Sequence, residues 1–186
     1  MRITKDMLKA WSACHAGYKW FIEKFPEGEG EYQTILDALA EDDRPSDAQW
    51  LMRKAGADVG AILEIESGAG RKHVFAAGYL KISGGLQVKG YICAGAGIKA
   101  GTGIKAGTGI KAGEGIEAGW GIEAGWGIKA GAGMGIFAGL CVRISRWAIS
   151  ARVSAKTKPE NLISGAWAPV SCDETASVTL TTAEEV

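Results

Sequence analysis

The chain has 186 residues, and its 21 Lys and Arg residues balance its 21 Asp and Glu residues. This length allows one substantial domain, or a small domain fused to a repeat array, with no need for metal or disulfide support. The balanced charge argues against a long-range field that would attract nucleic acid or an anionic membrane, so direct nucleic-acid binding is not expected. The N-terminus lacks the pattern of a signal peptide, and charges interrupt the Gly-rich middle every sixth residue. We therefore expect a cytoplasmic protein without a membrane-spanning segment.

Cysteine and histidine are too scattered to predict a metal site. The sequence has no CxxC pair, and no histidine lies at zinc-ligand spacing from a cysteine. These residues are Cys14, Cys93, Cys141, Cys172, His15 and His73. We interpret the cysteines as reduced thiols, and we expect neither a metal nor a cofactor.

Residues 1–57 have the pattern of a small helical segment. Thr4 is placed to cap a helix, and apolar residues recur at helical spacing from Leu8 to Phe25. This spacing predicts one amphipathic helix that ends near Pro26. A segment of this size is near the lower limit for independent stability, so we expect it to pack on the rest of the chain.

Two shorter helices are expected in the second half of this segment. Apolar residues from Tyr32 to Leu39 indicate the first of them. Ser46 and Gln49 have the spacing of a capping box for the second, and Gly56 fits the position just past its end.

Residues 58–153 are predicted to form a β-solenoid, with regular hexads from 74 to 134. Large apolar residues recur with a strict period of six, and a small apolar residue stands two positions after most of them. The large residues are Val74, Leu80, Leu86, Ile92, Ile98, Ile104, Ile110, Ile116, Ile122, Ile128 and Met134. Each hexad therefore predicts a short strand with an inward pair, and the glycines between strands predict tight corners. The fold class is mainly β, a parallel β-helix of undecided handedness.

The period of six does not by itself determine how many residues form one coil. Three sides give about eighteen residues per coil, with coils stacked about 4.8 Å apart. This arrangement places Lys99 over Glu117 and Lys105 over Glu123, but it also places Lys111 over a second lysine, Lys129. A two-sided coil of twelve residues would match three of its four charge pairs, so both lengths stay open.

Apolar alternation continues after the hexads, from Ile136 to Ile144 and from Trp147 to Val153, without glycine corners. This pattern predicts longer strands or a cap. Residues 154–186 are expected to form a C-terminal cap with a final edge strand and a tail, because both ends of a solenoid must be covered.

The array carries no recognisable active site. Left-handed β-helix acyltransferases share the hexapeptide period, but they place a small residue where this chain often has Thr, Glu or Trp. They also use a histidine at a cleft between subunits, and the array has none after His73. Gly101, Gly103 and Gly107 do not have the GxGxxG spacing of a dinucleotide site. We expect no enzyme and no small-molecule substrate, with a hexapeptide acyltransferase as the weakest alternative.

Two groups of residues are candidates for an interaction site. Trp120, Trp126 and Glu114 occupy a corner slot that otherwise holds Ala or Thr, and a narrow Ile/Ala interior accommodates neither an indole nor a lone carboxylate. Two outward indoles would offer aromatic area typical of interfaces, unless the C-terminal tail covers them. The second group is an acidic surface on the helical segment: Glu27, Glu29, Glu31, Glu41, Asp42 and Asp43.

Three stretches of the chain carry a resemblance to known proteins. KAWSACHAGYKWFIEKFPEG, LDALAEDDRPSDAQWLMRKAG and the repeated GIKAG and GIEAG blocks resemble uncharacterised phage and prophage proteins. The resemblance implies a small phage accessory protein, a class in which inhibitors of bacterial defence, including anti-CRISPR proteins, are common. It carries over no site residue. The run from Leu86 to Ala94 also resembles the β-helix of bacterial cytoskeletal bactofilins, which implies a self-assembling role.

The sequence thus supports two hypotheses of different kinds. The first is a non-enzymatic, phage-derived binding protein that acts on a host protein in the bacterial cytoplasm. The second is a structural protein that forms homo-oligomers through the ends or sides of its solenoid.

Overall fold

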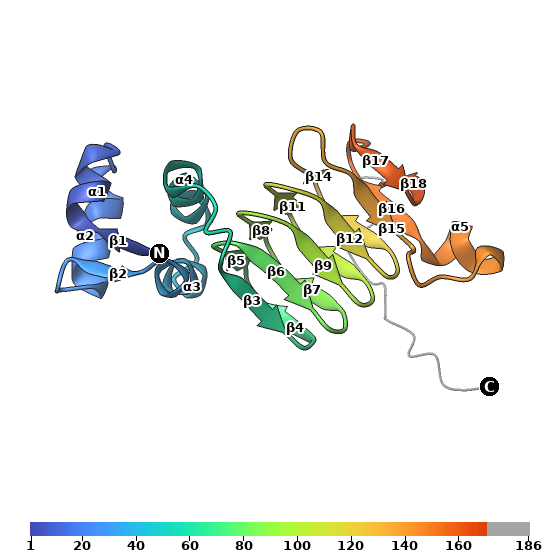
Figure 1. Ribbon diagram of the computed structural model, residues 1–186, viewed down its shortest axis with the longest axis horizontal. Coiled ribbons are helices and arrows are strands. Elements are labelled where there is room, and N and C mark those ends of the chain that lie inside the picture. Colours follow the sequence, from blue (N-terminus) through green and yellow to red (C-terminus); the bar gives the residue numbers. More distant parts are fainter. Residues whose placement is uncertain (171–186) are drawn as a thin grey trace.

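The computed structural model describes residues 1–170, as a helical segment at one end of a parallel β-solenoid (Figure 1). The helical segment contains α1 (Lys5–Ala10), α2 (His15–Lys24), α3 (Tyr32–Glu41) and α4 (Pro45–Ala55). An antiparallel pair joins β1 (Arg2–Thr4) to β2 (Glu29–Glu31) beside these helices. The helices enclose a small core of their own, which includes Leu8, Phe21, Leu36 and Leu51.

The single helix expected from Leu8 to Phe25 is wrong, because the chain forms two helices there. Ser12 adopts a φ of 60°, and the Ala13 amide donates to the Leu8 carbonyl at 2.9 Å, which closes α1. The Cys14 Sγ then accepts a hydrogen bond from the Gly17 amide and starts α2. Apolar spacing did not show this break, because both helices bury residues in the same core.

The predicted helix ends are partly confirmed. Thr4 caps α1 by accepting a hydrogen bond from the Met7 amide at 3.3 Å, and Gly56 ends α4 with a φ of 75°. The capping box at Ser46 is wrong, because α4 already begins at Pro45 with Arg44 before it. Proline fits this first helical position, since its missing N–H would have no partner there.

The solenoid has three sides, each a parallel sheet. Side 1 contains β3 (Ile62–Ile65), β6 (Tyr79–Ile82), β9 (Ile98–Ala100), β12 (Ile116–Ala118), β15 (Ile136–Ala138) and β17 (Leu162–Ser164). Side 2 contains β4 (Gly68–Arg71), β7 (Leu86–Val88), β10 (Ile104–Ala106), β13 (Ile122–Ala124), β16 (Arg152–Ala155) and β18 (Ala166–Pro169). Side 3 contains β5 (Val74–Ala76), β8 (Ile92–Ala94), β11 (Gly109–Ala112) and β14 (Gly127–Lys129). Within residues 1–170, side 3 therefore has four strands where the other two sides have six.

Strand register settles the length of the coil at about eighteen residues, with about six coils in all. Ile104 pairs with Leu86 on one side and with Ile122 on the other. The three-sided coil is therefore confirmed, and the twelve-residue alternative is excluded.

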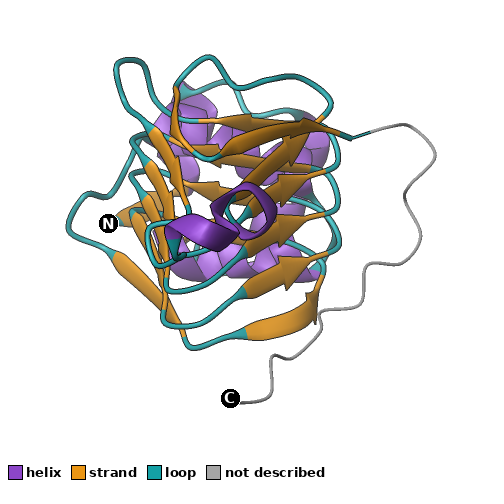
Figure 2. Ribbon diagram, turned by 90° about the vertical axis from the view of Figure 1, so that its right-hand side faces the viewer, coloured by secondary structure: helices purple, strands orange, loops and turns teal. Residues whose placement is uncertain are grey.

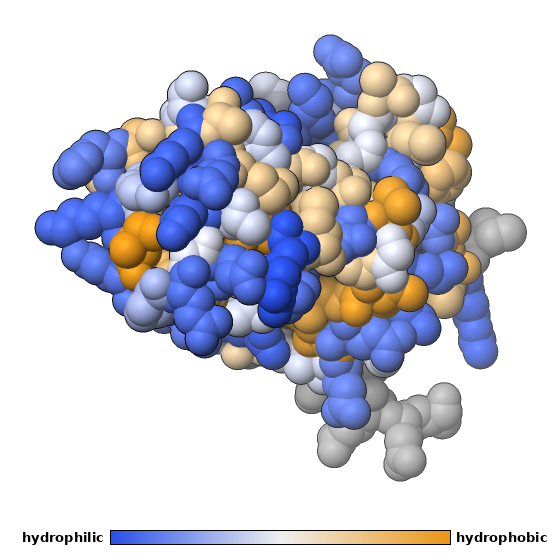
Figure 3. Space-filling model, turned by 60° about the vertical axis from the view of Figure 1, so that its left-hand side comes forward, coloured by the Kyte–Doolittle hydropathy of each residue, from blue (hydrophilic) through white to orange (hydrophobic). Residues whose placement is uncertain are grey.

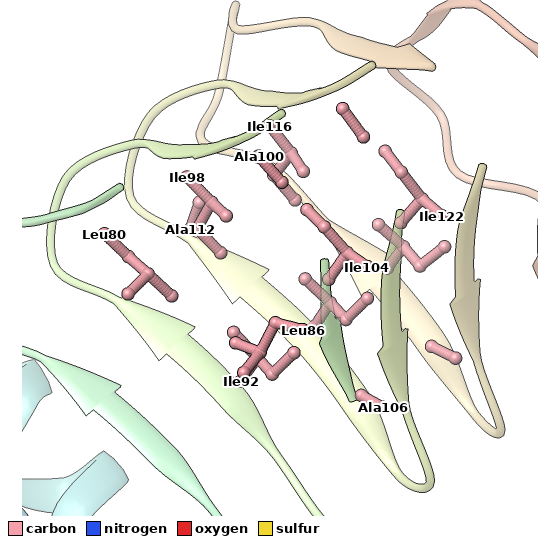
Figure 4. Close-up of a cluster of buried hydrophobic side chains, with 14 of the residues drawn as sticks. Leu80, Leu86, Ile92, Ile98, Ala100, Ile104, Ala106, Ala112, Ile116 and Ile122 are labelled. Carbon is pink, nitrogen blue, oxygen red and sulfur yellow. The ribbon is translucent and has the colours of Figure 1, made fainter. Parts of the chain in front are cut away.

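The interior is a column of aliphatic side chains, and most strands from β8 on contribute one large residue and one alanine (Figure 4). Ile116 and Ala118 of β12 are both fully buried, and the corresponding residues of the neighbouring coils lie directly above and below them. The predicted inward pair is confirmed for the hexads that begin at Val74 through Ile128. The prediction is wrong at Met134, which is 45% exposed. Two extra residues precede β15, so Ile136 takes the inward position and pairs with Ile116.

The corner glycines are required for a steric reason rather than for conformational freedom. No glycine between residues 85 and 131 has a positive φ. Instead, a Cβ added at Gly101 would collide with the carbonyl oxygen of Ser83 in the coil beneath. The same collision would recur one side further on, between Gly107 and Lys89. Successive coils approach too closely at these corners for any side chain.

Two ion pairs predicted for an eighteen-residue coil are present at the outward positions. Lys99 and Glu117 form an ion pair at 3.2 Å on side 1, and Lys105 and Glu123 form one at 3.0 Å on side 2. Such exposed pairs stabilise a fold only weakly, so they report the register rather than cause it. On side 3, Lys111 pairs in register with Lys129, which leaves two like charges on adjacent strands.

The longer strands expected after residue 136 are wrong. β15 ends at Ala138, and Gly139 follows it with a φ of 80°. The chain then leaves the solenoid through a 3-10 turn (Ile144–Arg146) and α5 (Trp147–Ser150), and returns as β16. Figure 2 shows α5 lying across the C-terminal end of the coil. The cap was predicted for residues 154–186, but within that range β17 and β18 continue sides 1 and 2 of the solenoid. The predicted final edge strand and tail fall on residues 171–186, outside the described residues.

Replacing Ile116 by Asp tests the assignment of inside and outside. A carboxylate in this dry column would cost several kcal/mol, within reach of the roughly 5–15 kcal/mol that stabilises a whole domain. We expect Ile116→Asp to abolish cooperative melting monitored by circular dichroism. Glu117→Lys, the adjacent outward change, should shift melting only slightly, and equal damage from both would contradict the assignment.

Candidate interaction site

The helical segment covers the first coils of side 3, and one of its contacts is made by Gln33. The Gln33 side-chain amide donates to the Phe75 carbonyl at 2.8 Å, and its oxygen accepts from the Ala77 amide at 2.9 Å. These are the two groups that a further strand beside β5 would pair. Gln33 thus closes one edge of the sheet, which would otherwise be open to another chain.

Outward residues beneath the helices become part of the helical core. Phe75 and Cys93 point out of the solenoid, yet they are almost completely buried against α3 and its neighbours. Burial raises the pKa of the Cys93 thiol to about 12. Cys93 is therefore protonated and inaccessible at neutral pH.

His73 is a structural residue in the same contact. Its Nδ1 accepts a hydrogen bond from the Tyr91 amide at 3.0 Å, so Nε2 carries the proton and donates to Asp43 Oδ1 at 2.9 Å. The ring is stacked with Phe75 and Tyr91. The hydrogen bond from His73, with a second from Lys72, lowers the pKa of the Asp43 carboxyl. With both nitrogens engaged, His73 joins the helical segment to the solenoid.

The acidic residues of the helical segment do not form one free patch. Glu29 and Glu31 both contact Arg2. Asp42 accepts a hydrogen bond from the Trp20 indole at 2.7 Å and another from Lys24, and these two bonds lower its pKa. Asp43 bonds Lys72 and His73, as described above. Glu27 and Glu41 are exposed. Figure 3 shows this helical end, where hydrophilic residues surround smaller hydrophobic areas.

Trp120 and Trp126 lie at the two corners that border β13 on side 2. Their side chains are 44% and 66% exposed within the described structure. The Trp120 and Trp126 backbone amides donate to the carbonyl oxygens of Thr102 and Thr108. These threonines fill the same corners one coil earlier. Trp126 also lies beneath the Lys156 ammonium, which is 4.8 Å from the ring centroid.

Side 2 presents small and charged residues between these two indoles. Its outward residues near the tryptophans are the Lys105–Glu123 ion pair and the small side chains of Ser154 and Ala168. We call this area the tryptophan-bordered surface. Glu114 belongs elsewhere, because it lies at the corner between sides 3 and 1 and accepts a hydrogen bond from the Tyr79 hydroxyl at 2.8 Å.

Side 3 carries a trough that was not predicted from the sequence. The trough has a volume of about 670 Å³ and runs from Gln49 of α4, past Lys111 and Lys129, to the loop of residues 156–161. A second cleft of about 320 Å³ lies in the helical segment between Cys14, Trp20 and Trp50. In the sequence, Lys111 stacked over Lys129 marks side 3 as different from the two sides with Lys–Glu pairs, but it does not indicate a hollow.

The described residues contain neither a candidate metal site nor a candidate membrane-spanning helix. No group of three or more His, Cys, Asp and Glu side chains is arranged to hold a metal ion within residues 1–170. Over the same range, no helix is both long and apolar enough to cross a membrane.

The fold places the protein in the class of parallel β-solenoids with an N-terminal helical module. Residues 1–57 match the family model described as the YdhT N-terminal domain. This match ends one residue after Gly56, which follows α4, so it covers the helical module and none of the solenoid. No curated protein and no solved structure matches the chain.

Replacing Gln33 by Ala should loosen the helical module from side 3. The substitution leaves the Phe75 carbonyl and the Ala77 amide without a partner, at a cost of about 1–3 kcal/mol. We expect faster alkylation of Cys93 by iodoacetamide in the native protein, measured by mass spectrometry of the modified peptide. Gln87→Ala, the same change on the outward surface of side 2, is the control. Equal Cys93 reactivity in the two variants would contradict the role assigned to Gln33.

Proposed function

We propose that the protein is a non-enzymatic binding protein and that the tryptophan-bordered surface of side 2 recognises another protein. The observation that supports this proposal is the exposure of Trp120 and Trp126 in a slot that the fold also fills with Ala or Thr. The solenoid itself therefore has no need of an indole at either corner. An exposed tryptophan is the type of residue that anchors protein interfaces.

The surroundings of the two indoles suit a protein partner. Side 2 is built from parallel strands stacked in register, so the corners are held at a fixed separation. A rigid surface loses little conformational entropy on binding, and small residues such as Ser154 allow close approach. The Lys105–Glu123 pair between the indoles adds polar contacts without net charge.

For the biological setting, we propose a phage accessory protein that inhibits a bacterial defence complex in the host cytoplasm, in the manner of an anti-CRISPR protein. The resemblance of the helical and repeat segments to phage and prophage proteins supports this setting. A rigid solenoid suits inhibition by occupation of a surface, since such inhibition requires contact rather than chemistry.

The alternative function is self-assembly, as in bactofilins, and one observation favours it. Apolar residues are exposed at the C-terminal end of the solenoid, where Ile149 is 77% and Ile163 68% exposed. Exposed apolar area at an end of a repeat array is a route to end-to-end association. Light scattering separates the two functions, because a monomer at all concentrations would exclude assembly.

The double change Trp120→Thr and Trp126→Thr tests the proposed surface. Thr occupies the same slot at positions 102 and 108, so we expect the melting temperature to change little. Loss of an interface tryptophan costs roughly 2 kcal/mol or more, so binding should weaken at least about thirtyfold. The measurement is affinity capture of the partner from the bacterial host, with mass spectrometry and then titration.

Thr102→Ala with Thr108→Ala changes the same corners one coil earlier and serves as the matched control. Capture should survive in this control. A large fall in the melting temperature of the tryptophan variant would mean that the indoles are structural, and unchanged capture would place the interface elsewhere. Either result would contradict the proposal.

A further inference from the structure

The side-3 trough lies where one strand of the solenoid is missing from the described structure. The chain visits sides 1, 2 and 3 in turn, but after β16 the position on side 3 is taken by the loop of residues 156–161. This loop crosses the edge of β14 and is held at both ends. The Lys156 amide donates to the Trp126 carbonyl at 3.1 Å, and the Asn161 side chain donates to the Gly131 carbonyl at 3.1 Å.

Between these two anchors, β14 has an open edge. Within residues 1–170, β14 pairs only with β11. The hollow beside it reaches the solenoid interior, because Ile128 and Ile136 of the core line it together with the loop. An edge of this kind accepts an added strand through its free backbone groups.

The trough is also basic. Lys111 and Lys129 lie on adjacent strands of its floor, and Lys158 faces them from the loop, with Glu160 as the one acidic residue in the lining. The equivalent outward positions of sides 1 and 2 hold Lys–Glu ion pairs. Within residues 1–170, neither Lys111 nor Lys129 has such a pair. Like charges on adjacent strands are unfavourable, so an acidic occupant would relieve them.

Residues 171–186 are acidic, whereas the trough is basic. Residues 171–186 contain Asp173, Glu174, Glu184 and Glu185, and they contain no Lys or Arg. Val178 and Leu180 alternate with threonines, a pattern typical of a strand. β18 lies on side 2, and in the earlier coils the chain passes from side 2 to side 3. The Val170 amide donates to the Ala155 carbonyl at 3.2 Å, so Val170 lies beside the start of the loop of residues 156–161.

We propose that the trough is the docking site of the protein's own C-terminal segment, residues 171–186. The segment adds to the open edge on side 3, and its carboxylates pair with Lys111, Lys129 and Lys158. At about 3.3 Å per residue it is long enough to cross one side of the coil several times over. Its docking would close the edge that β14 leaves open, as Gln33 closes the edge of β5 at the other end.

Zero-length carbodiimide cross-linking of the full-length protein tests this proposal without any partner. The reagent joins a lysine to a carboxylate only when the two are in contact. We expect links within one chain between the trough lysines and the carboxylates of residues 171–186, identified by mass spectrometry of the monomer band. The Lys99–Glu117 and Lys105–Glu123 pairs, at 3.2 and 3.0 Å, provide internal positive controls.

Two charge-reversed variants make the result specific. The change of Lys111 and Lys129 to Glu keeps Lys158 as a reactive trough lysine. The reversed charges repel the carboxylates of residues 171–186, so the links from Lys158 to this segment should be lost while the Lys105–Glu123 link stays intact. Lys99→Glu, a reversal on side 1, should leave the links to residues 171–186 in place. Control links without any link from residues 171–186 to the trough would overturn the proposal. Links found only in a dimer band would also overturn it, because the occupant would then be a second copy.

Discussion

The stacking of one coil on the next, eighteen residues later, is the constraint on which the rest of the structure depends. It places Ile over Ile and Ala over Ala through the interior, so each hexad is buried only because its neighbours are present. It also forces glycine at the corners, where Gly101 passes the Ser83 carbonyl too closely for a side chain. The same spacing decides which outward residues meet. Opposite charges meet on sides 1 and 2, whereas Lys111 meets Lys129 on side 3.

The three sides of this regular array have become different surfaces. Side 3 is covered at its first coils by the helical module, through Gln33, His73 and the buried Cys93, and is hollowed at its last coils. Side 2 carries an indole at each of the corners that border β13. A regular array is suited to this division of roles, because outward residues can change without disturbing the interior. The proposed binding surface and the proposed docking trough meet at one corner, at Trp126.

Much of the solenoid could be predicted from the sequence, because its determinants are local and repeat many times. The period of six fixes the inward residues, and the charged positions between them fix the outward ones. The number of sides required the pairing of distant residues such as Ile104 and Ile122, and the charges alone matched two lengths of coil. The break between α1 and α2 was missed because it depends on the backbone at Ser12 rather than on apolar spacing.

The candidate surfaces could be predicted only in part, for a related reason. Trp120 and Trp126 stood out against a repeat that does not need them, and they are exposed within the described structure. The acidic residues lie close together in the sequence, and this proximity predicted one acidic surface. In the fold they have separate partners: Glu29 and Glu31 contact Arg2, whereas Asp42 and Asp43 accept hydrogen bonds from Trp20 and His73. The trough was missed because it depends on a strand that is absent from side 3 of residues 1–170, which no local pattern reports.

The most direct test of the eighteen-residue coil is the proximity of outward residues on successive coils. Cys14, Cys141 and Cys172 are first changed to Ser, and pyrene is attached to cysteines introduced by Lys99→Cys and Glu117→Cys. This labelled protein should give excimer emission as a monomer. Cysteines at Lys99 and Lys111, twelve residues apart, should give none, because these residues lie on different sides. Excimer emission from the second pair and not from the first would contradict the three-sided coil and every surface assigned from it.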